Sequence, residues 1–138
     1  MGYKVELKAP ALDEFANLRT QVKWKNPDDE ALKASIENSQ FWVAVYDIDK
    51  LIGTGRVIGD GAMYFYIQDI IVAPSYQKQG IGHLVMTHIE NYLTNTCSNG
   101  ATVGLLSAHG KESFYTHYGY VKRDGDSLGL GMCKFISK

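Results

Sequence analysis

The pattern of hydrophobic and polar positions predicts a strand and two helices in the first third of the chain. Residues 3–7 alternate between apolar and polar, which is typical of a short half-buried strand, and Pro10 ends that pattern. In residues 12–18 the apolar positions recur at helical spacing. The acidic run at residues 28–30 resembles a helix start, and it predicts a second helix that continues through Ile36.

The next part of the chain predicts three strands joined by tight turns. Residues 41–46 and 51–58 are rich in β-branched and aromatic residues, and the polar tetrapeptide between them predicts a hairpin. Gly59-Asp60-Gly61 is a strong turn signal. The run at 63–72 is long and mostly apolar, as expected of a strand in the centre of a sheet.

The remaining pattern predicts alternating helices and strands. An apolar stripe at helical spacing begins at Ile81 and ends before Asn99-Gly100. We expect a short strand at 102–106, a short helix at 112–118 ended by Gly119, and final strands at 120–121 and 132–136. Hairpins early in the chain and helical crossovers later predict a mixed α/β sheet.

Composition and charge narrow the class of protein. The chain has 138 residues, of which 45% are hydrophobic and 21% charged, so we expect one folded domain over residues 1–138. A formal net charge of -1 argues against non-specific nucleic-acid binding. We find neither an apolar run of membrane-spanning length nor an apolar signal region, so we expect a cytoplasmic protein without a membrane partner.

The strongest chemical motif is Gln77-Lys78-Gln79-Gly80-Ile81-Gly82, between the long strand and the long helix. The first N–H groups of a helix have no acceptor within the helix, and glycines let an anion approach them. Lys78 adds positive charge, so the segment predicts a pyrophosphate site. It is neither a P-loop nor a dinucleotide fingerprint, because no Gly-Lys-Ser/Thr follows and Val85 stands at the third glycine position. Gly53-Thr-Gly55 we interpret as turn and hairpin glycines.

These residues resemble the acetyl-CoA signature of the GNAT (Gcn5-related N-acetyltransferase) superfamily. Its pattern, Gln/Arg-x-x-Gly-x-Gly/Ala, is matched by Gln77, Gly80 and Gly82, and the stretch 67–82 is similar to that of glucosamine-6-phosphate N-acetyltransferases. The segment Phe114-Tyr-Thr-His-Tyr-Gly-Tyr120 resembles a second element of the family. The order of predicted elements over the whole chain also agrees.

The resemblance implies an α/β (α+β) fold of the acyl-CoA N-acyltransferase type. Six to seven strands would form a mixed central sheet with about four helices, and the fourth and fifth strands would splay apart around acetyl-CoA. The backbone of the fourth strand would then pair with the pantetheine arm. The residues expected to bind acetyl-CoA are Ile70, Ile71, Val72, Gln77, Lys78, Gln79, Gly80, Ile81, Gly82, His83, Phe114 and Tyr115.

The resemblance also implies which residues take part in the reaction. Tyr115 aligns with a tyrosine that lies near the sulfur of the cofactor in many family members, where a phenol can protonate the leaving thiolate. A packed aromatic residue is the alternative interpretation. Asp69 is a candidate to orient the amine or accept its proton, and a structural hydrogen bond is equally compatible with the sequence. Gln68 stands where a related enzyme class has glutamate, so it cannot act as a base. Gln68, Asp69 and Trp24 are the expected substrate-binding residues.

The implied function is transfer of an acetyl group from acetyl-CoA to a primary amine of a small molecule, within a ternary complex and without a metal. The alternatives are a protein or peptide N-acetyltransferase and a non-catalytic acyl-CoA-binding sensing module. In this family the acceptor is chosen mainly near residues 18–30 and 123–132. We interpret the basic residues of the first region, with Arg19 among them, as a solvated face rather than as a site for an acidic amine. Cys97 and Cys133 we interpret as structural, and we expect a monomer or homodimer.

Overall fold

The computed structural model describes residues 2–138 as two compact units, one that runs through Val103 and a second that is Gly104–Lys138. The first unit begins with a strand and two helices, continues through a meander of three strands, and ends with a long helix and the start of a fifth strand. Its elements are β1 (Lys4–Glu6), α1 (Leu12–Gln21), α2 (Asp29–Glu37), β2 (Phe41–Asp47), β3 (Lys50–Gly59), β4 (Tyr64–Val72), a 3-10 turn (Pro74–Tyr76), α3 (Ile81–Thr96) and β5 (Thr102–Leu105). The second unit contains one further helix, α4 (Glu112–Thr116).

The strands form one mixed sheet in the order β1-β2-β3-β4-β5. β1 to β4 pair antiparallel with their sequence neighbours. β5 begins beside β4, where the Thr102 N–H donates to the carbonyl of Met63 at 2.8 Å. The mixed α/β fold expected from the sequence is confirmed.

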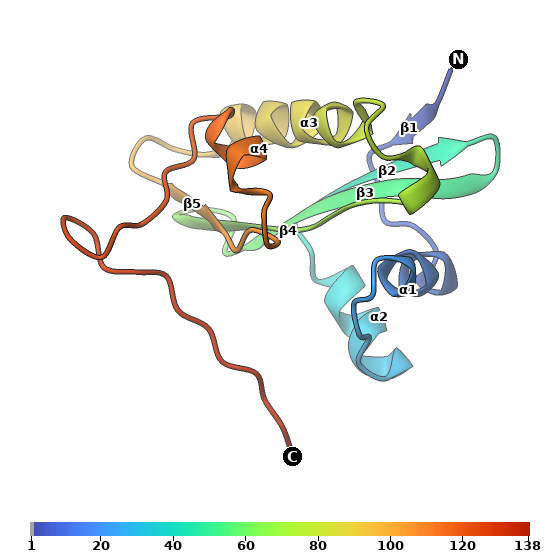
Figure 1. The fold of residues 1–138 in the computed structure, drawn as a ribbon, viewed down its shortest axis with the longest axis horizontal. Coiled ribbons are helices and arrows are strands. Elements are labelled where there is room, and N and C mark those ends of the chain that lie inside the picture. Colours follow the sequence, from blue (N-terminus) through green and yellow to red (C-terminus); the bar gives the residue numbers. More distant parts are fainter. Residues whose placement is uncertain (1) are drawn as a thin grey trace. The chain divides into compact units, whose positions relative to one another are not determined.

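Helices cover both faces of the sheet in the first unit. Figure 1 shows α3 on one face and the α1–α2 pair on the other. Phe15 of α1, Leu32 and Ile36 of α2, and Trp42 of β2 form a buried cluster. Of the stripe that the sequence predicted, α3 buries Ile81, Val85, Ile89 and Leu93, and it buries Met86 as well. Side chains on both faces of the central strands are therefore covered by helices and shielded from solvent.

Gly53 and Gly55 have a packing role that differs from the one expected. A Cβ at Gly55 would lie 2.5 Å from Val85 Cγ1 and 2.9 Å from Ile89 Cδ1, which is too close for real atoms. At Gly53 it would lie 2.9 Å from Ile81 Cγ2. The two glycines therefore allow α3 to approach β3 closely, and their interpretation as turn residues is wrong.

Two aspartates fix local structure as their positions suggested. The side chain of Asp28 accepts a hydrogen bond from the Ala31 N–H at 2.8 Å and so caps α2. Asp60 accepts from the N–H groups of Ala62, Met63 and Tyr64, which closes the turn between β3 and β4. These backbone hydrogen bonds lower the pKa of Asp60.

The two final strands expected from the sequence are absent from the described residues, so the sheet has five strands instead of six to seven. Residues 120–121 and 132–136 adopt no regular structure, and Met132 and Phe135 are 90% and 92% exposed. Among the described residues, the segment 132–136 has neither a partner strand nor a buried side chain, and a stable strand needs both. Within residues 2–138, no helix combines the length and the apolar character needed to cross a membrane.

Candidate active site

A β-bulge interrupts β4 at the position that the sequence singled out. Thr54 pairs with Ile71 and Arg56 with Gln68, so Asp69 and Ile70 together face Gly55 alone. Asp69 has a φ of 56°, in the left-handed region that is uncommon for residues other than glycine. The Thr54 hydroxyl donates to the carbonyl oxygen of Asp69 at 2.9 Å and holds this conformation. The strand segment 70–72, expected to pair with pantetheine, therefore starts at a bulge.

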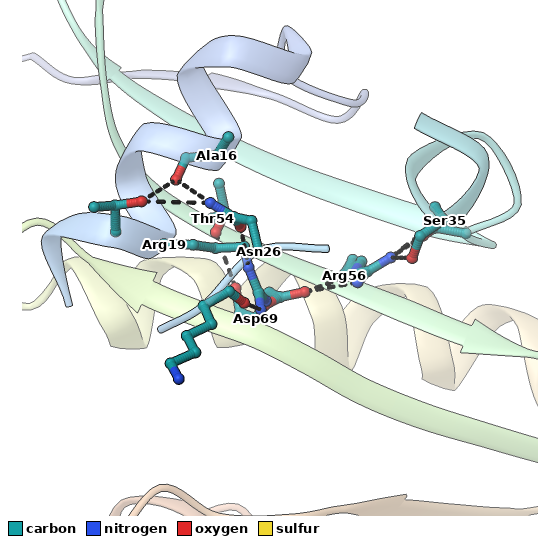
Figure 2. Close-up of polar contacts among 10 residues, drawn as sticks. Ala16, Arg19, Asn26, Ser35, Thr54, Arg56 and Asp69 are labelled. Carbon is teal, nitrogen blue, oxygen red and sulfur yellow. Dashed lines mark hydrogen bonds and ion pairs between the residues drawn. The ribbon is translucent and has the colours of Figure 1, made fainter. Parts of the chain in front are cut away.

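The carboxylate of Asp69 is fully buried between two arginines (Figure 2). The Arg56 Nε and Nη2 atoms each lie 2.8 Å from Oδ2, and Arg19 Nη1 donates to Oδ1. Both oxygens of the carboxylate are thus engaged with guanidinium groups. This arrangement favours the structural interpretation of Asp69 over that of a proton acceptor for the substrate.

Arg56 extends the network to α2. Its Nη1 donates to the Ser35 carbonyl at 3.2 Å, to the Ser35 hydroxyl at 2.8 Å and to the Ser39 hydroxyl at 3.0 Å. Among the described residues, every buried side-chain nitrogen and oxygen has a hydrogen-bond partner. The network is therefore fully satisfied, which a buried set of charges requires.

Sequence reasoning missed both arginines of this network. Arg56 lies in the mostly apolar run 51–58, where a charged residue is expected to be buried. Because a buried charge needs a partner of opposite charge, the sequence could have predicted its pairing with an acidic residue such as Asp69. Arg19 was assigned to a solvated face, and this was wrong, since its side chain is only 15% exposed. Trp24, an expected substrate-binding residue, is half-buried, with its ring centroid 5.5 Å from the guanidinium carbon of Arg19.

The glycine-containing loop leads into α3 through two residues in left-handed conformation. Lys78 and Gly80 have φ values of 65° and 86°. Gly80 is the N-cap of α3, and the structure gives that helix start no side-chain cap. A Cβ at Gly80 would meet nothing within 4 Å, so glycine is needed here for conformation rather than for packing space. Without a capping side chain, the partial positive charge at the helix start faces outward.

Side-chain hydrogen bonds hold this loop to the end of β4 and to the N-terminal segment. The Gln77 Nε2 atom donates to the carbonyl of Val72 at 3.0 Å, which links the expected pantetheine-binding segment to the expected pyrophosphate loop. The Tyr3 hydroxyl donates to Gln79 Oε1 at 2.8 Å. The structure therefore brings the two parts of the predicted cofactor site together within the first unit.

The two remaining residues of the predicted cofactor set lie in the second unit. Phe114 and Tyr115 are half-buried residues of α4, and their rings meet edge to face with centroids 5.0 Å apart. Tyr118 also packs edge to face on Phe114, at 5.7 Å. Tyr115 thus belongs to an aromatic cluster that fixes the orientation of its ring within its own unit.

Cys97 does not show the properties of a nucleophile. Cys97 follows the end of α3, and burial together with the negative charge of Glu90 raises the pKa of its thiol. Cys133 is exposed in the C-terminal segment. Over residues 2–138, no three or more His, Cys, Asp or Glu side chains are grouped in a way that could hold a metal ion.

We expect the two thiols to react with iodoacetamide at clearly different rates. Only the thiolate reacts, so the raised pKa and partial burial of Cys97 slow its alkylation relative to exposed Cys133. Peptide mapping after timed labelling at pH 8 measures both rates, and faster alkylation of Cys97 would contradict the description of its surroundings.

Comparisons with known proteins agree with this geometry. The family model described as acetyltransferase (GNAT) domain matches residues 37–122. A probable acetyltransferase of unknown function from meticillin-resistant Staphylococcus aureus has a similar structure, with 34% identity and a TM-score of 0.87 over 96% of this chain and 100% of that chain. Glucosamine-6-phosphate N-acetyltransferase from Arabidopsis thaliana shares the fold, at 15% identity and a TM-score of 0.73 over 99% of this chain and 100% of that one.

A curated relative by sequence is an uncharacterized N-acetyltransferase, ycf52, from Gracilaria tenuistipitata var. liui. It is 28% identical over 114 residues, which are 80% of this chain and 62% of that protein. The chain thus spans less than two thirds of this relative's length. The family match over more than half of the chain nevertheless shows that the protein belongs to the GNAT acetyltransferase family. The resemblance inferred from Gln77, Gly80 and Gly82 is confirmed.

Proposed function

We propose that this protein is an acetyl-CoA-dependent N-acetyltransferase that acetylates a primary amine of a small molecule. The observation that carries this proposal is the joined arrangement of the β4 bulge and the left-handed loop before α3, in a chain of the GNAT family. Strand, loop and helix start follow one another over residues 69–82. They offer backbone groups for an extended amide-containing arm and then a positive helix start for a pyrophosphate.

The cofactor site that we propose uses backbone more than side chains. Ile70, Ile71 and Val72 pair with the pantetheine amides, while the segment 77–82 and the N–H of His83 hold the pyrophosphate. Lys78 is exposed and supplies a mobile positive charge beside it. From the resemblance of residues 114–120 to the second family element, we also propose that Phe114 and Tyr115 contact acetyl-CoA.

The proposed reaction is direct transfer of the acetyl group in a ternary complex. The amine nitrogen forms a bond to the thioester carbonyl carbon, and the carbon–sulfur bond breaks. Tyr115 donates its phenolic proton to the departing thiolate, and ordered water carries the proton of the amine to solvent. Since Asp69 is held by two guanidinium groups, its role in this scheme is to fix the bulge.

A small acceptor is proposed because the stretch 67–82 is similar to that of glucosamine-6-phosphate N-acetyltransferases, one of which shares the fold of this chain. Gln68 and Trp24, both half-buried, are the side chains proposed to contact the acceptor.

The test is the release of free CoA from acetyl-CoA with a panel of small amines, polyamines and peptides. Turnover with a small amine supports the proposal. Turnover with peptides alone would replace it with a protein N-acetyltransferase. A rise in melting temperature with acetyl-CoA, without turnover on any acceptor, would indicate a sensing module instead.

We expect replacement of Gly82 by leucine to weaken acetyl-CoA binding about tenfold, which corresponds to about 1.4 kcal/mol. A bulky side chain in the first turn of α3 keeps the pyrophosphate away from the backbone N–H groups. Calorimetric titration of acetyl-CoA measures the dissociation constant. Asn91→Leu, on an exposed position of the same helix, is the matched control. Unchanged affinity in Gly82→Leu would remove the loop from the cofactor site.

A further inference from the structure

We propose that Arg19 is a positioning residue that couples the loop between α1 and α2 (residues 22–28, the acceptor loop) to the β4 bulge. This proposal rests on the proposed function, since it assigns the acceptor loop to binding of the amine. It adds a residue and a mechanism that the cofactor motifs do not contain. The Arg19 side chain makes contacts in both directions, toward the loop and toward the bulge (Figure 2).

The acceptor loop is attached to the fold largely through Arg19. Nη2 donates to the Lys25 carbonyl and Nε to Asn26 Oδ1, each at 2.8 Å. The Trp24 ring lies against the same guanidinium group, and the Trp24 N–H donates to the Arg19 carbonyl at 3.0 Å. Lys23, with a φ of 70°, makes the sharp turn that directs the loop back over Arg19. Three consecutive loop residues, 24–26, are therefore held by one side chain.

Asn26 adds a second attachment to the same helix. Its Nδ2 donates to the Ala16 carbonyl at 3.0 Å and to the Thr20 hydroxyl at 3.3 Å. These bonds hold the end of the loop to α1, but they do not reach the sheet. The Arg19 guanidinium connects this group of residues directly to the Asp69 carboxylate in β4.

The geometry requires arginine at position 19. A guanidinium group has five N–H donors in a planar fork, whereas an ammonium group is a compact charge. Here Nε, Nη1 and Nη2 each bind a different partner: Asn26, Asp69 and the Lys25 carbonyl. A lysine could keep the charge near Asp69, but it could not span all three partners.

Arg56 supplies the corresponding connection on the other side of the loop. It binds the same Asp69 carboxylate and also reaches Ser35 and Ser39, at the end of α2 and just beyond it. The helices on both sides of the acceptor loop are therefore tied to one residue of the bulge. That bulge begins the segment proposed to bind pantetheine, so acceptor and cofactor elements share one anchor.

The charges of the network indicate which variant is informative. A buried guanidinium group (Arg56) and a half-buried one (Arg19) share one carboxylate, so loss of Arg19 leaves a balanced Arg56–Asp69 pair in place. Loss of Asp69 would instead leave two cations unpaired, which destabilises the whole fold. Arg19→Gln should therefore release the acceptor loop while the bulge stays held by Arg56 and Thr54.

The experiment compares Arg19→Gln, Arg19→Lys and the exposed control Lys33→Gln with the wild-type chain. For Arg19→Gln we expect kcat/KM for the acceptor amine to fall at least tenfold, while the dissociation constant of acetyl-CoA changes less than twofold. Compared with Arg19→Gln, Arg19→Lys should regain thermal stability but not kcat/KM for the acceptor. If the role of Arg19 were purely structural, the lysine variant would regain stability and activity together.

Hydrogen exchange of the intact protein separates failure of this proposal from failure of the proposed function. We expect the amides of residues 22–28 to exchange faster in Arg19→Gln, with residues 70–72 unchanged. Unaltered exchange in the loop, or unaltered kcat/KM for the acceptor, would overturn the role of Arg19. A wild-type chain that acetylates no amine would contradict the proposed function. In that case, hydrogen exchange of residues 22–28 would still test whether Arg19 couples the acceptor loop to the bulge.

Discussion

Replacement of Asp69 by asparagine is expected to lower the free energy of unfolding by about 3–5 kcal/mol. The carboxylate is fully buried and accepts hydrogen bonds from Arg19 and Arg56 on its two oxygens. An asparagine amide carries no charge, and its NH₂ group would face an arginine donor without an acceptor. The buried guanidinium group of Arg56 and the half-buried one of Arg19 would then lack a counter-charge. Urea denaturation followed by circular dichroism measures the loss.

Asp49→Asn is the control for this prediction, because Asp49 is an exposed residue of the turn between β2 and β3. Exposed charges contribute little, so its effect on unfolding should stay below about 1 kcal/mol. If Asp69→Asn were as mild as this control, the two arginines would not depend on Asp69, and the description of the network as the anchor of the bulge would be wrong.

Replacement of Tyr115 by phenylalanine is expected to lower kcat about 100-fold with little change in the KM for acetyl-CoA, as loss of a general acid typically does. The phenyl ring retains the edge-to-face contact with Phe114, so the packing of α4 is preserved. The substitution removes the hydroxyl group that is proposed to protonate the departing thiolate. Steady-state kinetics with the best amine of the panel measures both constants.

Tyr118→Phe is the matched control, since Tyr118 packs on the same Phe114 ring and carries the same hydroxyl group. It should retain near wild-type kcat. If Tyr115→Phe kept full activity as well, Tyr115 would be a packing residue, which is the alternative that the sequence left open.

The elements with strong local patterns could be predicted from the sequence. The apolar stripe from Ile81 gave α3 its correct beginning, and Asp28 was correctly identified as the start signal of α2. The motif Gln77 to Gly82 identified the family, because its glycines, its lysine and its place between strand and helix are visible in the order of residues. Local chemistry of this kind does not depend on distant contacts.

Features that depend on distant contacts were missed or misread. Arg19 and Asp69 are 50 residues apart in sequence, and no local pattern reports that they meet. Gly53 and Gly55 were interpreted as turn residues because the close packing of α3 on β3 is a tertiary contact that the local sequence does not show. The final strands were expected from residue type alone, but a strand also needs a partner and a buried face.

The central claim is that this chain moves an acetyl group from acetyl-CoA directly to an amine. Mass spectrometry of the intact protein and of the acceptor, after incubation with isotopically labelled acetyl-CoA, tests it most directly. Direct transfer yields labelled acetyl-amine in equal amount to free CoA, with the protein unlabelled at every time point. Label on the protein that later passes to the amine would contradict direct transfer, and label on neither would contradict the proposed activity.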